Sequence, residues 1–203
     1  MNEFEKAVLG YFTPEQAQKI QSTKVFIAGC GGLGSNVAHM LVRCGFKNFA
    51  LLDFDILEMK NLNRQFYFPD QVGSPKNEEL AKTLLRLNPD LNLELISRKL
   101  QSQEEVKELV QGFDILVEAF DNPKSKSVFV NGAVPLGKPV IAVSGIAGFK
   151  DPDSIVTKKI GDNLYLIGDG VSDIKEVPPL SPRVNVAAAK QAGKVLELTL
   201  ENS

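Results

Sequence analysis

Histidine, cysteine and tryptophan are nearly absent from this sequence of 203 residues, which holds one histidine, two cysteines and no tryptophan. Two cysteines, Cys30 and Cys44, cannot build a four-cysteine zinc site or a disulfide framework. The single histidine, His39, falls inside a predicted helix, which argues against a Ser-His-Asp triad and against a histidine-rich metal site. The chemistry of this chain therefore has to be sought in other residue types.

The sequence also lacks a charge excess and a long apolar run. Its 23 basic residues nearly balance its 25 acidic ones, so the net charge is −2 and nothing electrostatic favours binding to nucleic acid. No apolar run approaches the roughly 20 residues of a membrane span, and residues 1–6 lack the basic start of a secretion signal. With 43% hydrophobic and 24% charged residues, we expect a globular, cytoplasmic protein with a single domain over residues 1–203.

Strand-like and helix-like segments alternate along most of the chain. An N-terminal helical arm (residues 1–22) contains a capping box formed by Thr13 and Gln16. Five short apolar runs then predict strands, at Lys24–Ala28, Asn48–Leu52, Leu91–Ile96, Asp114–Phe120 and Pro139–Ser144. Helical segments separate these runs. The alternation predicts an α/β fold, with a doubly wound, Rossmann-like parallel sheet and helices on both of its faces.

The pattern changes in the last quarter of the chain. Two strand-like runs, Ser154–Ile160 and Asn163–Ile167, predict a small C-terminal β-hairpin extension. The whole segment 149–180 fits a mobile crossover and a structural hairpin with a tether equally well. A closing helix is expected over residues 181–203, because a serine and a proline stand at its start.

A glycine-rich motif of the form G-x-G-x-x-G joins the first strand to the following helix. Its residues are Gly29, Cys30, Gly31, Gly32, Leu33 and Gly34. Glycines allow a tight turn, and they let backbone N–H groups and a helix N-terminus approach phosphates. Asp53 ends the second strand about 20 residues further on, where a carboxylate can accept hydrogen bonds from ribose hydroxyls. The motif predicts nucleotide binding and leaves NAD and ATP as alternatives.

The long polar loop after the second strand favours ATP. It carries Asp55, Asn61, Arg64 and Gln65, and Lys76 follows it. Two cations beside the nucleotide suit a triphosphate, which gathers negative charge on its leaving pyrophosphate, whereas hydride transfer has no need of them. Each cation alone is typical of a solvated surface, so only their joint occurrence after the glycine motif indicates a site.

A carboxylate and an amide, Asp121 and Asn122, stand at the end of the fourth strand. The first and fourth strands flank the crevice of a doubly wound sheet, so Asp121 is expected to face the glycine motif. Magnesium ions are held by one or two carboxylates together with phosphate oxygens, and Asp121 is the expected magnesium ligand. The same residue also fits a helix cap before Pro123.

In this order, the motifs resemble the superfamily of ubiquitin-activating and sulfur-carrier-activating enzymes. The resemblance covers nearly the whole chain, since it rests on the glycine motif, Leu51–Asp55, Asn61–Gln65, Asp121 with Asn122, and Ser181–Val186. At this length the chain is most similar to the short branch of the ThiF family. Members of that branch adenylate the sulfur carrier ThiS in thiamine biosynthesis, and the related MoeB enzymes activate the small subunit of molybdopterin synthase.

The resemblance implies a role for each matched residue. Asp53 would hold the ATP ribose, and Asn61, Arg64 and Lys76 would contact the phosphates. Arg64, Lys76 and Asp121 would be catalytic, the last through Mg²⁺. The residues expected at the nucleotide are Gly29, Gly31, Gly32, Leu33, Gly34, Asp53, Asp55, Asn61, Arg64, Lys76, Asp121 and Asn122. The C-terminal carboxylate of a ubiquitin-like carrier ending in Gly-Gly would attack the α-phosphorus of ATP. A carboxylate is already ionised at neutral pH, so the reaction needs no general base, in keeping with the scarcity of histidine.

The chain departs from the wider superfamily in two respects. Members with a structural zinc carry two cysteine pairs in the C-terminal half, and no cysteine follows Cys44, so we expect no zinc site. For the same reason we expect no cysteine thioester step there, and a separate protein would deliver sulfur. Relatives also place an arginine in the N-terminal arm that reaches the partner subunit, and the first arginine here is Arg43. A homodimer is implied by the resemblance alone.

Four alternatives remain at this level. A MoeB-like enzyme would act on the molybdopterin-synthase subunit, and a related tRNA-modifying dehydratase would adenylate a small carboxylate. An NAD-dependent oxidoreductase is supported only by the glycine motif and Asp53. A non-catalytic adaptor would keep the fold without turnover, although the retained Arg64, Lys76 and Asp121 argue against it.

Overall fold

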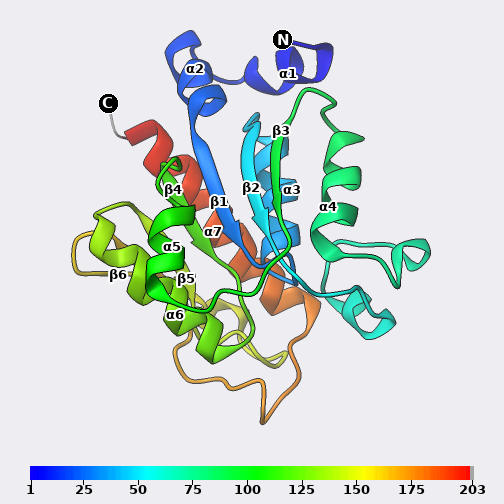
Figure 1. Ribbon diagram of the computed structural model, residues 1–203, viewed down its shortest axis with the longest axis vertical. Coiled ribbons are helices and arrows are strands. Elements are labelled where there is room, and N and C mark those ends of the chain that lie inside the picture. The colour runs from blue at the N-terminus through cyan, green and yellow to red at the C-terminus, as the bar shows by residue number, and fades with distance from the viewer. Residues whose placement is uncertain (202–203) are drawn as a thin grey trace.

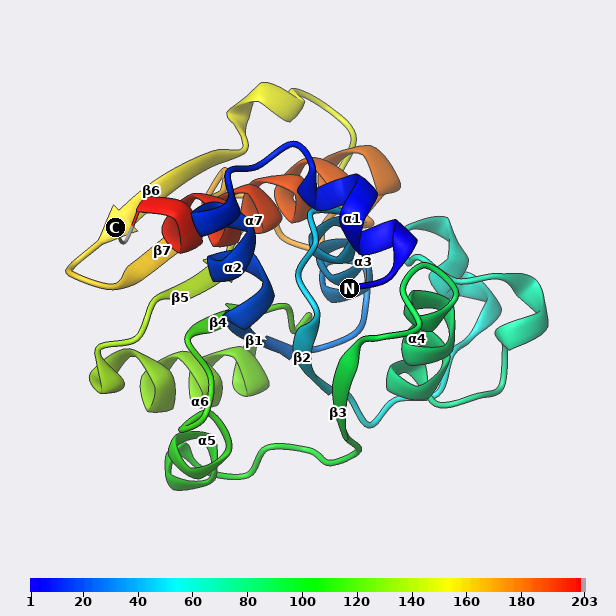
Figure 2. The same ribbon diagram turned by 90° about the horizontal axis from the view of Figure 1, so that it is seen from above.

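The computed structural model describes residues 1–201, which form a seven-stranded sheet between two layers of helices (Figures 1 and 2). The strands are β1 (Lys24–Ala28), β2 (Asn48–Leu52), β3 (Asn92–Ile96), β4 (Ile115–Glu118), β5 (Val140–Val143), β6 (Val156–Ile160) and β7 (Leu164–Gly168). The α-helices are α1 (Glu3–Leu9), α2 (Pro14–Ser22), α3 (Gly34–Arg43), α4 (Lys76–Leu85), α5 (Gln103–Leu109), α6 (Pro123–Ala133) and α7 (Ser181–Glu201). The end of the expected closing helix, residues 202–203, lies outside the described residues.

The sheet has the order β3-β2-β1-β4-β5-β7-β6, and every neighbouring pair is parallel except β6 with β7. This arrangement confirms the predicted doubly wound sheet with a hairpin extension. The hairpin does not stand apart, because β7 pairs in parallel with β5 and makes the hairpin part of the sheet. Strand β1 lies between β2 and β4, which puts the change of winding direction at the ends of β1 and β4.

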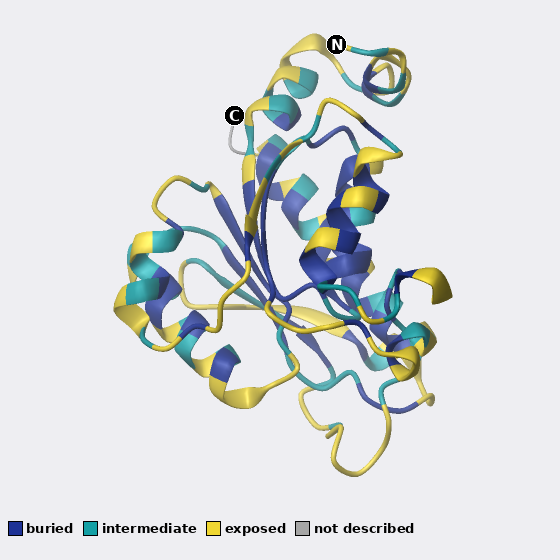
Figure 3. Ribbon diagram, turned by 45° about the vertical axis from the view of Figure 1, so that its right-hand side comes forward, coloured by how far each residue is buried: buried dark blue, intermediate teal, exposed yellow. Residues whose placement is uncertain are grey.

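Alternate side chains of the strands enter two separate cores. In β1, Val25 and Ile27 join the core under α3, α4 and α7, whereas Phe26 and Ala28 join the core under α5 and α6. Figure 2 shows these helices on opposite faces of the sheet. Since both faces are covered, the central strands are apolar except at their first or last residues, as is usual for buried parallel strands. Figure 3 shows the buried strands inside and the exposed loops at the lower end of the sheet.

The N-terminal arm consists of two short helices, each opened by a capping box. Asn2 accepts a hydrogen bond from the Glu5 N–H at 2.8 Å, and Thr13 accepts one from the Gln16 N–H at 3.3 Å. The fully buried Glu5 carboxylate accepts a hydrogen bond from Asn88 Nδ2 at 3.2 Å. This bond holds α1 against the loop between α4 and β3. Both helices lie at the end of the sheet opposite the loops that follow β1 and β4 (Figure 1).

No helix within residues 1–201 is both long enough and apolar enough to cross a bilayer.

Candidate nucleotide site

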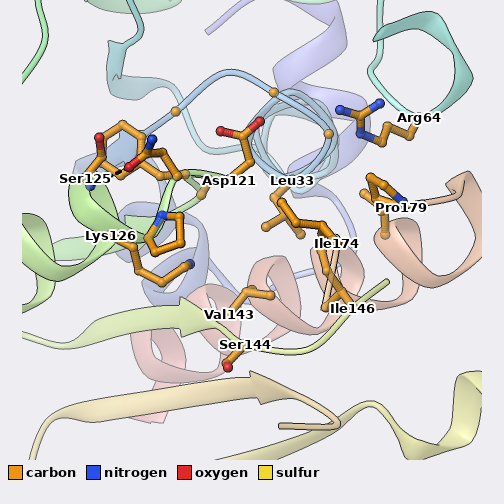
Figure 4. A pocket seen from close by; sticks show the side chains of 18 of the residues that line it. Leu33, Arg64, Asp121, Ser125, Lys126, Val143, Ser144, Ile146, Ile174 and Pro179 are labelled. Atoms are coloured by element: carbon orange, nitrogen blue, oxygen red, sulfur yellow. Dashed lines mark hydrogen bonds between the residues drawn. The ribbon is translucent and has the colours of Figure 1, made fainter. Parts of the chain in front are cut away.

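A cleft of about 710 Å³ opens beyond the carboxyl ends of β1, β4 and β5. The glycine-rich loop after β1 forms one wall, and the residues after β4 and β5 form the other. Figure 4 shows its lining, with the side chains of several elements directed into the open space. The cleft thus occupies the position at which a doubly wound sheet binds its ligand.

The glycine-rich loop needs its glycines for close approach. A Cβ on Gly29 would lie 2.7 Å from the Ala119 carbonyl oxygen, and its φ of 104° is unfavourable for other residues. A Cβ on Gly34 would lie only 1.8 Å from the Gly29 carbonyl oxygen. Gly34 lies outside the cleft lining and lets α3 begin against the loop, whereas the preceding residues Gly29, Gly31, Gly32 and Leu33 line the cleft.

Asp53, the residue directly after β2, fixes the loop and faces the cleft. Its Oδ2 accepts a hydrogen bond from the Cys30 N–H at 2.6 Å, and its Oδ1 accepts one from the Asp55 N–H at 2.8 Å. Burial raises the pKa of Asp53, and these hydrogen bonds together with the nearby Lys76 oppose that rise. Each carboxylate oxygen keeps a further lone pair for a ribose hydroxyl.

The two predicted phosphate-binding cations, Arg64 and Lys76, both reach the cleft. The Lys76 Nζ donates to Asp55 Oδ2 at 2.9 Å, and the lysine is only 6% exposed, so its ammonium is held at one place. The Tyr67 hydroxyl lies 2.7 Å from the Cys30 carbonyl oxygen and 3.0 Å from that of Lys76. Tyr67 thereby ties the glycine-rich loop to the start of α4.

Besides Gly34, Asn61 is the predicted binding residue that does not line the cleft. It is buried in the 3-10 helix Met59–Asn63, and its Oδ1 accepts the Glu58 N–H at 3.0 Å. The structure therefore shows it shaping the loop that presents Arg64, and a phosphate contact remains only a prediction.

Asp121 and Asn122 lie on the cleft wall, as predicted. Asn122, and not Asp121, caps α6, because its Oδ1 accepts the N–H groups of Lys124 at 2.9 Å and Ser125 at 3.3 Å. The Asp121 carboxylate is exposed and makes no hydrogen bond or ion pair within residues 1–201. It is thus available to a ligand or to a cation that a ligand brings.

The structure adds side chains that the motif analysis left out. Lys99, Lys126 and Lys175 also line the cleft, as does Gln65, which the motif contains. The Gln65 Oε1 is buried and has no hydrogen-bond partner among residues 1–201, which is costly unless a bound water satisfies it. Gln65 could have been found from its place beside Arg64, whereas the lysines come from three separate segments and only the fold brings them together.

Residues 169–180, here called the cover segment, follow β7 and border the cleft. Its anchor is Arg183 in the first turn of α7, which is 3% exposed. The guanidinium pairs with Asp169 and donates to the carbonyl oxygens of Lys150 and Asp151. Burial acts to raise the pKa of Asp169, but hydrogen bonds from the N–H groups of residues 171 and 172 and the charge of Arg183 outweigh it and lower that pKa.

A comparison with known protein families places this chain in one of them. The model of the ThiF family matches residues 5–151 of this chain. The chain belongs to the ThiF family. This ThiF-family chain is 38% identical over 105 residues to ubiquitin-like modifier-activating enzyme 5 of Arabidopsis thaliana. That alignment covers 52% of the chain and 23% of the relative. The chain is 28% identical over 190 residues to molybdopterin-synthase adenylyltransferase of Haemophilus influenzae, in an alignment that covers 91% of the chain and 77% of the relative.

The ThiF-family chain spans between 21% and 32% of the length of the first three curated relatives it matches. Among solved structures, the tRNA N6-threonylcarbamoyladenosine dehydratase TcdA of E. coli, in complex with AMP, has a TM-score of 0.86 at 17% identity. That match covers 97% of this chain and 93% of TcdA and supports the fold alone. E. coli MccB with ATP has a TM-score of 0.72 at 26% identity, covering 92% of this chain and 58% of MccB.

Proposed function

We propose that this protein is an adenylyltransferase that uses ATP to activate the C-terminal glycine carboxylate of a small ubiquitin-like sulfur carrier, with a ThiS-type carrier of thiamine biosynthesis as its substrate. The observation that carries this proposal is the composition of one cleft. It unites the glycine-rich loop, Asp53, the cations Arg64 and Lys76, and the exposed Asp121, and its lining contains neither histidine nor cysteine. Such a site suits a reaction driven by positioning and charge neutralisation.

The residues of the cleft fit a nucleoside triphosphate. Asp53 would accept hydrogen bonds from the ribose, and Gln65 lines the same cleft. Arg64 and Lys76 would bind the phosphates from the side of the glycine-rich loop. The names of the relatives, an adenylyltransferase and ubiquitin-like modifier-activating enzymes, support this assignment, as does the ATP in the MccB structure.

Asp121 fits a magnesium ion that arrives with the triphosphate. Within residues 1–201 no group of three or more His, Cys, Asp or Glu side chains could hold a metal by itself. Magnesium usually takes one or two carboxylates and completes its shell with phosphate oxygens and water, so one free carboxylate suffices. When bound, the ion neutralises charge on the phosphates, and the role of Asp121 is to orient it.

A carrier of the molybdopterin-synthase type is the second candidate. It is favoured by the relative from Haemophilus influenzae, because the match to that enzyme covers 91% of this chain. Both candidates share the chemistry and differ in the surface of the carrier. We also propose, from the family resemblance, a cytoplasmic homodimer and a separate sulfur donor that acts on the adenylate.

The test is to incubate the protein with ATP, Mg²⁺ and each carrier in turn, and to read the intact mass of the carrier and the released pyrophosphate. We expect one AMP unit to be added to the ThiS-type carrier. Adenylation of the molybdopterin-synthase subunit instead would keep the chemistry and change the substrate. ATP binding without turnover on any carrier would favour the adaptor, and stabilisation by NAD but not by ATP would favour the oxidoreductase.

A further inference from the structure

One of the cations that line the cleft, Lys126, lies on the wall opposite Arg64. Lys126 projects from α6 into the cleft beside Val143 and Ser144 at the end of β5. Figure 4 shows Lys126 and Arg64 on opposite sides of the cleft, with Asp121 between them. The two cations are therefore placed to bind two different anionic groups.

A buried carboxylate holds Lys126 in this position. Glu118, the last residue of β4, is fully buried, and its Oε2 pairs with the Lys126 Nζ. Its Oε1 accepts the Phe120 N–H at 2.8 Å, and its Oε2 also accepts the Val143 N–H at 3.4 Å. Moving Lys126 away would leave the buried Glu118 without a cation, which is strongly unfavourable.

The pair leaves donor capacity toward the cleft. An ammonium group has three N–H donors, and Glu118 is the acceptor that Lys126 has within residues 1–201. The Lys126 side chain is 28% exposed, so its remaining donors can reach a ligand. The neighbouring Val143, Ile146 and Ile174 are apolar and do not compete for that ligand.

The proposed reaction requires a cation at this wall. The attacking carboxylate has to approach a triphosphate, and two anions at contact distance repel each other unless a positive group lies beside each. Arg64 and Lys76 lie on the nucleotide side. We propose that Lys126 binds the carboxylate of the acyl substrate, with Glu118 as its positioning residue; this inference rests on the proposed function.

The chemical step balances without a further reactant. One carboxylate oxygen forms the new bond to the α-phosphorus, and the bond from that phosphorus to the bridging oxygen of the β-phosphate breaks. The electron pair leaves with pyrophosphate. No proton is transferred, so Lys126 keeps its own and acts by holding the carboxylate in line.

The experiment compares a ThiS-type carrier ending in Gly-Gly in two forms, one with a free C-terminal carboxylate and one with a C-terminal amide. Binding of both forms is measured by calorimetry with α,β-methylene ATP, which blocks turnover. We expect the wild type to prefer the acid by about tenfold or more, as for one hydrogen bond between charged groups. The double variant Glu118→Gln/Lys126→Gln removes the cation without leaving an unpaired buried charge. Because the new amide NH₂ at position 118 faces a backbone N–H group, circular dichroism and a urea melt are used to verify that the variant is folded.

We expect the double variant to lose the preference for the acid, Lys126→Arg to keep it, and all three proteins to bind the ATP analogue equally. Lys124→Gln, at an exposed position of the same helix outside the cleft, is the matched control and should bind like the wild type. The same preference in the double variant, or no preference in the wild type, would overturn the inference. Failure of the proposed function is a separate observation, the absence of pyrophosphate release with ATP and unmodified carriers.

Discussion

Arg183→Met should destabilise the protein by about 3 kcal/mol. Removing one partner of a buried ion pair costs about 3–5 kcal/mol, because the remaining charge stays in a poorly solvated place. Arg183 is 3% exposed, and the side chain of Asp169 is 9% exposed, so some water reaches the carboxylate and the lower end of the range applies. The variant also leaves the carbonyl oxygens of Lys150 and Asp151 without their donor.

Urea unfolding followed by circular dichroism measures this loss. For a domain of this size, 3 kcal/mol corresponds to a decrease of about 1 M in the urea midpoint. Lys190→Met, at an exposed position of the same helix, should change the stability by less than about 0.5 kcal/mol and serves as the control. The double variant Asp169→Asn/Arg183→Met should lose less than the sum of the single losses, because no unpaired charge is left.

The pH dependence gives a second readout of the same pair. The pKa of Asp169 is lowered in the folded state, so its ionised form contributes stability above the unfolded pKa. That contribution is lost as the pH falls through the folded pKa, and the difference between wild type and Asp169→Asn should shrink over that range. A midpoint shift below about 0.3 M for Arg183→Met, or full additivity in the double variant, would refute this account of the anchor.

Three further predictions concern the cleft. Gly34→Ala should lower the free energy of unfolding by about 1–3 kcal/mol or more in urea melts, since its Cβ would overlap the Gly29 carbonyl oxygen. Gly112→Ala is the control, because its Cβ would meet no atom within 4 Å and the free energy of unfolding should stay unchanged. Asp53→Asn should cost about 1–3 kcal/mol and weaken ATP binding in a calorimetric titration, because the new amide NH₂ must face a backbone N–H donor. Asp121→Asn should reduce carrier-dependent pyrophosphate release by about 100-fold with little change in stability, and unchanged release in Mg²⁺ would argue against its role at the metal.

The sequence made the fold and the glycine-rich loop predictable because their signals are local. Apolar runs, the glycine motif and the capping box at Thr13 each lie within a few residues, and all three appear in the structure. The predicted arm is helical in the structure, and a capping box at Asn2 and Glu5, with the same three-residue spacing, opens the first of its two helices.

The remaining features depend on contacts that no local pattern encodes. The pair of Glu118 with Lys126 joins the end of a strand to the following helix inside the cleft. The anchor formed by Arg183 and Asp169 joins the residue after β7 to the first turn of α7. Asn61, by contrast, belongs to a local motif. Its Oδ1 accepts a hydrogen bond within its own loop, and the phosphate contact that the motif implies stays a prediction.

The exchange of labelled pyrophosphate into ATP tests the central claim most directly, because it requires formation and reversal of an acyl-adenylate in the cleft. The account predicts rapid exchange with ATP, Mg²⁺ and a carrier that ends in a free glycine carboxylate. It predicts background exchange when the carrier is omitted or carries a C-terminal amide. Exchange that does not depend on the carboxylate, or no exchange with either carrier type by a protein that binds ATP, would contradict it.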